Sequence, residues 1–187
     1  MNELELIKSI TSGNTTDYKY IVEKYTNIVF RTCLGYVHNR EEAEDLTQEV
    51  FISAFKSLEK FKGNSAFSTW LYRISVNTSL NHLRSKQGNK FKNLFRNSDL
   101  NKNSNDYINI ASSDISPEEN IINSEKRSRV NYALSKLPEN QKTAIILSKY
   151  NDLSQKEIAD VMGKTEGAVE ALIQRAKENL KKILIKN

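Results

Sequence analysis

Apolar residues recur at helical spacing through the first 85 residues of the chain. They form three stripes: Tyr20, Ile21, Tyr25, Ile28, Val29 and Tyr36; then Leu46, Val50, Phe51, Ala54 and Phe55; then Phe67, Trp70, Leu71, Ile74 and Leu83. Steps of three and four residues place such side chains on one face of a helix, which can then pack into a core. Turn-forming pairs such as His38-Asn39 separate the stripes. Residues 1–85 are therefore predicted to form a small helical bundle.

Residues 86–115 break this pattern. Seven asparagines fall in this segment, with scattered serines and lysines, and no apolar stripe is longer than one helical turn. Such a composition buries too little apolar surface to offset the entropy lost on ordering, so it predicts a flexible linker. A new helix is then predicted from Ser116 as its cap, Pro117 at its first position and Glu119 three residues after the cap.

The segment 116–187 contains the pattern of a helix-turn-helix. Ser154 and Glu157 have the spacing of a capping box at the start of a short helix, and Gly163 ends that helix where a positive φ is often needed. The small Ala159 permits a steep crossing, and Thr165 can cap the next helix, which is predicted to read the major groove. The inner face of that helix is Val169, Leu172, Ile173, Ala176 and Leu180. A packed helical pair with no DNA role would show the same stripes.

The distribution of charge favours a polyanionic partner for the carboxy-terminal part. The net charge is +5, yet residues 1–85 carry ten basic and ten acidic residues, whereas residues 128–187 carry eleven and seven. Four basic side chains of the last predicted helix can neutralise phosphates: Arg175, Lys177, Lys181 and Lys182. Glu166 and Glu170 lie on the same predicted helix. A glutamate there is either repelled by phosphate or accepts a hydrogen bond from a cytosine amine, and both interpretations stay open.

Several features favour a cytoplasmic protein. Met1–Leu6 has neither the basic start nor the apolar core of a secretory signal, and no window approaches the run of about 18 apolar residues that a membrane span needs. We therefore expect no membrane insertion. The single cysteine, Cys33, cannot form an internal disulfide and is predicted to be a packed core thiol.

The run from Phe61 to Arg84 interleaves aromatic, amide and basic residues. Core packing explains part of this mixture, since Phe67, Trp70 and Leu71 fall on one stripe. Single-stranded nucleic acid would also use it, by stacking bases on rings and reading their edges with amides. The residues alone favour neither explanation.

This run, together with Ala43–Phe51 before it, resembles region two of the extracytoplasmic-function (ECF) sigma factors of the sigma-70 family. The tail from Leu137 to Lys177 resembles their region four. The resemblance implies an all-α fold of two small helical domains, region two in 1–85 and the region four helix-turn-helix in 116–187, joined by the flexible linker 86–115. It also implies a non-enzymatic protein that binds RNA polymerase core, recognises promoter DNA and promotes strand opening. An anti-sigma factor is a further partner that the family allows.

The resemblance assigns three sets of site residues. The polymerase-docking set is Asp45, Gln48 and Glu49, of which the first and last lie one helical turn apart. The minus-ten set is the base-holding loop residues Phe61, Ser65, Ala66 and Phe67, with Arg73, Asn77 and Asn81 after them. The minus-thirty-five set is Lys164, Thr165, Glu166, Glu170, Ala171, Gln174 and Arg175. Glu170 and Ala171 stand where a basic and a hydroxyl residue are frequent in the family, which leaves the identity of the upstream element open.

Two other functions compete with this one. A metal-dependent hydrolase could be built on the acidic run Glu41, Glu42, Glu44, Asp45 and Glu49, but these point around much of a helix, and His38 and His82 have no partners at ligand spacing. No phosphate-binding glycine loop or nucleophile–base pair is present, so no catalytic residue, metal or cofactor is predicted. An autonomous helix-turn-helix regulator is the other alternative; it would bind duplex DNA without polymerase.

Overall fold

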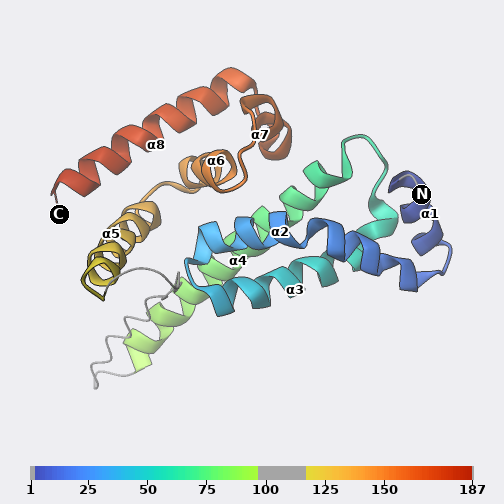
Figure 1. Cartoon of the computed structure of the whole chain (residues 1–187), viewed down its shortest axis with the longest axis horizontal. Coiled ribbons are helices and arrows are strands. Elements are labelled where there is room, and N and C mark those ends of the chain that lie inside the picture. Colours follow the sequence, from blue (N-terminus) through green and yellow to red (C-terminus); the bar gives the residue numbers. More distant parts are fainter. Residues whose placement is uncertain (1–2, 97–116, 187) are drawn as a thin grey trace.

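The computed structural model describes residues 3–96 and 117–186, and every regular element within them is helical. In chain order these are α1 (Glu3–Thr11), the 3-10 helix η1 (Thr15–Asp17), α2 (Tyr18–Val37), α3 (Arg40–Ser57), the 3-10 helix η2 (Leu58–Lys60), α4 (Phe67–Arg96), α5 (Pro117–Ser135), α6 (Glu139–Tyr150), α7 (Gln155–Met162) and α8 (Glu166–Lys186). Figure 1 shows α1–α4 gathered in one group, the amino-terminal bundle, and α5–α8 in a second, the carboxy-terminal bundle. The predicted all-α fold is confirmed.

The core of the amino-terminal bundle is formed where α2, α3 and α4 pack against one another. Members of all three predicted stripes are almost fully buried, among them Val29, Val50 and Leu71 at 1%, 0% and 0% exposure. The predicted break at His38-Asn39 is also present. His38 adopts the left-handed conformation with φ 54°, and the Asn39 side chain accepts a hydrogen bond from the first turn of α3.

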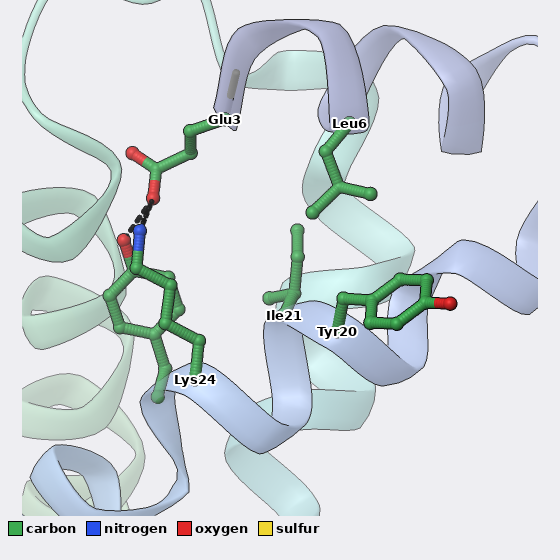
Figure 2. A pocket seen from close by; sticks show the side chains of 6 residues that line it. Glu3, Leu6, Tyr20, Ile21 and Lys24 are labelled. Carbon is green, nitrogen blue, oxygen red and sulfur yellow. Dashed lines mark hydrogen bonds and ion pairs between the residues drawn. The ribbon is translucent and has the colours of Figure 1, made fainter. Parts of the chain in front are cut away.

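Two aromatic residues of the predicted stripes are not core residues. Tyr20 is 47% exposed and Phe55 40% exposed, because each is next in sequence to a residue that takes the buried position, Ile21 and Ala54 respectively. Neighbouring residues on a helix point about 100° apart, so the packed helices cover only one of each pair. Figure 2 shows the consequence for Tyr20, which lines an open pocket of 420 Å³ between α1 and α2 with Leu6 and Ile21.

Helix α4 is longer than the sequence predicted. It runs without a break to Arg96, so residues 86–96, expected to begin the flexible linker, are helical. This stretch contains no proline and several good helix formers, and extending an existing helix is far easier than nucleating a new one. The remaining residues of the predicted linker, 97–115, lie outside the described residues. Helix α5 begins at Pro117, where the Ser116-Pro117 pair predicted a start.

The predicted helix-turn-helix is present in α7 and α8. Ser154 and Glu157 form a reciprocal capping box, and Gly163 ends α7 in the left-handed conformation with φ 62°. The hydroxyl of Thr165 accepts a hydrogen bond from the Ala168 N–H at 3.3 Å, as expected of a cap. On the inner face of α8, Val169, Ile173 and Ala176 are buried, while Leu172 and Leu180 are half-buried.

The two bundles are in contact, which no sequence pattern predicted. Helix α6 packs against α2, and α7 packs against α4. Tyr36, Tyr72 and Val76 of the amino-terminal bundle share one continuous apolar core with Ile146 and Ile158 of the carboxy-terminal bundle. The minus-ten side chains expected on α4 are therefore positioned beside the helix-turn-helix.

Candidate nucleic-acid interface

The three predicted polymerase-docking residues lie together on the outer face of α3. Asp45, Gln48 and Glu49 are exposed, while the opposite face of the same helix, which includes Leu46 and Val50, is buried against α2 and α4. The exposed face continues one turn further to Ile52, which is 54% exposed. Ile52 was missed in the sequence, although it follows Gln48 and Glu49 at the spacing of one helical turn.

Two other carboxylates of the acidic run, Glu42 and Glu44, are engaged in ion pairs. The Glu42 carboxylate accepts hydrogen bonds from His82 at 3.1 Å and from Lys86 at 2.5 Å, which tie α3 to α4. Burial opposes ionisation of Glu42, but these hydrogen bonds outweigh it and lower its pKa. Glu44 pairs with Arg40 at 2.9 Å within α3. Among the side chains that the structure describes, those of residues 3–88 and 125–186, no three histidine, cysteine or carboxylate groups lie together so that they could hold a metal ion.

An aromatic cluster fixes the loop before α4. The rings of Phe61 and Trp70 lie with their centroids 5.4 Å apart, and each lies 5.3 Å from the ring of Phe67. Phe67 is only 1% exposed, so its ring lies in the core, as its place in the predicted apolar stripe indicates. Its assignment to the base-holding loop stays a prediction. Ala66 is exposed, and Phe61 and Ser65 are half-buried. These three loop residues remain accessible to solvent beside the aromatic cluster.

The remaining minus-ten residues, Arg73, Asn77 and Asn81, lie one helical turn apart on one face of α4, and all three are exposed. Arg73 and Asn77 open into a pocket of 360 Å³ whose other walls come from the carboxy-terminal bundle. The Arg73 guanidinium donates a hydrogen bond to the backbone carbonyl oxygen of Asp160 in α7 at 2.5 Å. The structure thus brings Arg73 and Asn77 together, on the side of α4 that faces α6 and α7.

The reading helix presents its predicted residues to solvent. All seven are exposed: Lys164, Thr165, Glu166, Glu170, Ala171, Gln174 and Arg175. The Thr165 hydroxyl is already used as a cap, and the Gln174 amide donates to Glu178 at 3.1 Å, so these two have less free hydrogen-bonding capacity. The basic side chains of α8 beyond Arg175 are exposed as well. The helix can therefore offer Arg175 to phosphate or base and Glu170 to a base edge.

A buried lysine at the contact between the bundles was missed in the sequence, because Lys142 carries no signal that separates it from a solvated surface residue. Lys142 is 6% exposed, and its ammonium donates to the Tyr36 carbonyl oxygen at 3.0 Å. The Tyr36 hydroxyl lies 2.6 Å from the Thr143 hydroxyl in the same contact. Burial lowers the pKa of Lys142 to about 8. Burial also lowers the pKa of His38 to about 4, and the positive charge of Lys142 adds a smaller effect in the same direction.

The fold and these surfaces define a class: an all-α protein in which a helix-turn-helix accompanies a helical bundle with an exposed polar and acidic face. Family models agree with this class. The model for sigma-70 region 2 matches residues 21–89, and a model for sigma-70 region 4 matches residues 127–180.

Whole-chain relatives agree as well. The RNA polymerase sigma-H factor of Pseudomonas aeruginosa is 34% identical over 183 residues, covering 96% of this chain and 92% of the relative. The ECF RNA polymerase sigma factor SigW of Bacillus subtilis is 30% identical, with 95% and 94% covered. The ECF RNA polymerase sigma-E factor of Escherichia coli K12 is 34% identical, with 92% and 89% covered. The chain belongs to the sigma-70 family, in its ECF subfamily of RNA polymerase sigma factors.

Two solved structures share the fold. CnrH, solved in complex with the cytosolic domain of CnrY, has a TM-score of 0.64 at 22% identity, covering 97% of this chain and 96% of that one. The sigma factor RpoE of Bartonella quintana, solved with the anti-sigma factor NepR, has a TM-score of 0.60 at 19% identity, with 90% and 96% covered. Among the described helices of the present chain, none combines the length and apolar character that a bilayer crossing requires.

Proposed function

We propose that the chain acts as a non-enzymatic subunit of bacterial RNA polymerase in the cytoplasm, binding the core enzyme, recognising promoter DNA and promoting strand opening. One observation carries the proposal: the two sigma-70 models match in order, one on each helical bundle, and together they cover both the docking face of α3 and the reading helix α8. The division into residues 1–85, 86–115 and 116–187 as region two, linker and region four is part of the proposal.

Each surface then has a separate role. The face of α3 with Asp45, Gln48 and Glu49 docks on the core enzyme, and Ile52 adds apolar area to it. The loop residues Phe61, Ser65 and Ala66, with Arg73, Asn77 and Asn81 on α4, contact the melted minus-ten element, while Phe67 supports the loop from the core. The exposed residues of α8 read the minus-thirty-five element. An anti-sigma factor is a third partner, supported by the Bartonella relative solved with one.

The proposal is tested by reconstitution with purified core polymerase. The chain and the core enzyme, together and separately, are incubated with a pool of genomic fragments, and the transcripts are sequenced. We expect transcripts with reproducible start sites only when both proteins are present. An autonomous regulator gives the opposite result, tight binding of duplex DNA by the chain alone with no effect on start sites.

Removing the amide of Asn77 should impair strand opening. An extruded base loses a few kcal/mol of stacking, about what one or two good base-edge contacts return. Asn77 is exposed and alanine favours helix, so we expect Asn77→Ala to keep its fold and core binding but to form about tenfold less open complex. Permanganate footprinting measures this on the preferred promoter and on one changed at the contacted base.

The defect should shrink on the changed promoter. Asn27→Ala, which removes an exposed amide from α2, is the matched control and should open both promoters normally. An equal loss on the two promoters, or no loss on either, would remove Asn77 from the recognition set.

Two substitutions separate phosphate contact from base reading on α8. Arg175→Ala should weaken binding of the upstream element by about 1–3 kcal/mol. Lys149→Ala, which removes an exposed positive charge from α6, should leave this binding unchanged. Glu170→Ala should lose the preference for one base pair, because its carboxylate accepts from a cytosine amine. Holoenzyme affinity for promoters with single base-pair changes measures both effects. Unchanged preference with slightly tighter binding would show that Glu170 only faces solvent.

A further inference from the structure

Helix α1 lies beside the loop of residues 61–66 that leads into α4, as Figure 1 shows. It packs against α2 and against η2, the element from which this loop starts. Its residues Ile7 and Ile10 are buried in the same core as Tyr25 and Phe67. All of α1 precedes residue 21, where the match to sigma-70 region 2 begins, so that match gives α1 no role.

One contact joins α1 directly to the loop. Gly63 adopts the left-handed conformation with φ 71°, and a β carbon built on it would lie 3.9 Å from Cδ2 of Leu4. This is an ordinary van der Waals distance, so the Leu4 side chain lies next to the loop backbone. Leu4 is nevertheless 52% exposed. About half of this apolar side chain is therefore left out of the core and placed beside the loop.

A second connection runs through Tyr25 of α2. The Glu3 carboxylate accepts a hydrogen bond from the Lys24 ammonium at 2.8 Å (Figure 2) and another from the Tyr25 hydroxyl. Burial opposes ionisation of Glu3, but these hydrogen bonds outweigh it and lower its pKa. Burial, followed by the hydrogen bond to Glu3, raises the pKa of Tyr25 to about 12. At neutral pH an ionised acceptor on α1 therefore meets a neutral donor on α2, which makes a charge-assisted hydrogen bond.

The Tyr25 ring packs against the aromatic cluster that supports the loop. Its centroid lies 5.4 Å from that of Phe67, which in turn contacts Trp70 and the loop residue Phe61. Tyr25 and Phe67 are 8% and 1% exposed, so neither ring can move without displacing its neighbours. Holding the Tyr25 hydroxyl in place therefore holds the cluster in place beneath the loop.

We propose that α1 positions the base-holding loop: Leu4 contacts the loop backbone, and Glu3 fixes Tyr25 beneath it. Glu3 and Leu4 are then positioning residues, which act on strand opening through the loop. Contacts that repay the stacking lost by an extruded base require their groups to be held within about 0.5 Å of the productive geometry. The inference rests on the proposed function, because it takes this loop as the part that holds the minus-ten base.

The single tryptophan of the chain tests the inference without polymerase. Trp70 lies in the aromatic cluster, so the quenching of its fluorescence by acrylamide reports on the packing beneath the loop. Three variants are compared in the full chain: Leu4→Ala, Glu3→Ala and Tyr25→Phe. The last of these removes the hydroxyl and keeps the ring.

We expect each variant to raise the quenching constant of Trp70 about twofold, because a cluster with less support opens more often. Helix content measured by circular dichroism should stay unchanged. Lys8→Ala and Glu23→Ala, which shorten exposed side chains of α1 and α2, are the matched controls and should leave the quenching as it is.

The same variants are then combined with core polymerase. Each should bind the core enzyme normally but form about fivefold less open complex. Glu3→Gln keeps an oxygen that accepts from Tyr25, so it should open promoters nearly as well as the original chain. Since Glu3→Ala and Tyr25→Phe break the same hydrogen bond, the double variant should be no worse than the more defective single variant.

Unchanged quenching in all three variants, or increased quenching with normal promoter opening, overturns the inference. Reduced opening by Leu4→Ala with unchanged quenching would overturn it too, since Leu4 would then touch the DNA itself. Leu4 is exposed, so this variant keeps the test decisive even where a change at the buried Tyr25 unfolds the chain. If the original chain opens no promoter with core polymerase, it is the proposed function that fails instead.

Discussion

Reversing Asp45 and Glu49 together, in Asp45→Lys/Glu49→Lys, should abolish capture of core RNA polymerase while leaving the helix content unchanged. Both side chains are exposed one turn apart on α3, and neither has a hydrogen bond or ion pair among the contacts found in the described structure, so the fold does not depend on them. Placing like charges across an interface typically costs several kcal/mol. Two reversals should therefore weaken binding by a factor of about 100 or more. A pull-down with purified core enzyme measures the loss.

A matched control separates this local effect from a change in net charge. Glu23→Lys/Glu59→Lys makes the same charge change at two exposed positions outside the docking face and should retain core binding. The loss for the α3 variant should also be smaller at high salt, where repulsion between exposed charges is screened. Undiminished capture of the core enzyme by Asp45→Lys/Glu49→Lys would exclude this face as the docking surface.

Replacing Lys142 by methionine should stabilise the contact between the two bundles, the closed state of the chain, by about 1–2 kcal/mol. Lowering the pKa of the amine from its ordinary 10.5 to about 8 corresponds to about 3 kcal/mol against burying the charged form. Methionine fills a similar unbranched volume without that cost. The Tyr36 carbonyl oxygen loses its hydrogen-bond donor, however, which reduces the gain by about 1–2 kcal/mol. Lys149→Met, an exposed lysine of the same helix, is the control and should change nothing.

The same lysine predicts how closure depends on pH. Below pH 8 it is charged in both states, so the closed state bears the full desolvation cost. Between about 8 and 10.5 the closed state loses this proton while the open state keeps it, so closure should strengthen as the pH rises through this window. Between about pH 8 and 9 the neighbouring groups keep their charge in both states: Tyr36 and His38 are neutral, and Glu139 is ionised beside Arg84. Near pH 10 and above, Tyr36 ionises in the open state and opposes closure, because burial raises its pKa only in the closed state.

Closure can be measured directly by electron–electron resonance between spin labels on Glu23→Cys and Lys181→Cys in the Cys33→Ser background, one on each bundle. The fraction at the short distance should grow from about pH 7.5 to about pH 9 in the chain with Lys142 and stay constant in Lys142→Met. A pH response of equal size in both chains would show that another group controls closure.

The class of fold and the local structure of the reading unit could be predicted from the sequence because they depend on short-range rules. A capping box at Ser154 and Glu157, a left-handed turn at Gly163 and an apolar stripe through Val169 involve residues at most a few turns apart. The exposed face of Asp45, Gln48 and Glu49 follows in the same way from helical periodicity. The resemblance to a family added the roles of these residues, which spacing alone does not contain.

Where periodicity failed, the reason was the arrangement of neighbouring helices. Tyr20 and Phe55 share stripes with buried residues but lie just beyond the area that the other helices cover. Phe67, in contrast, is buried as its stripe predicts, with Tyr25, Phe61 and Trp70 packed around its ring. A single helix has a well-defined apolar side, but the width of the side that becomes buried depends on how many helices pack against it.

The contact between the bundles was decided by tertiary structure alone. Gly35 of α2 meets Ile146 of α6 in this contact, although the two are far apart in the sequence. In its own helix, Gly35 looks like a residue that mildly destabilises the helix, and Ile146 looks like an ordinary core residue. Lys142 is likewise indistinguishable in sequence from a solvated lysine. Neighbouring residues set helical periodicity and caps, so the sequence was enough to predict where helices form. Which surfaces of those helices meet depends on the fit of side chains that are distant in the sequence, and only the three-dimensional packing contains that information.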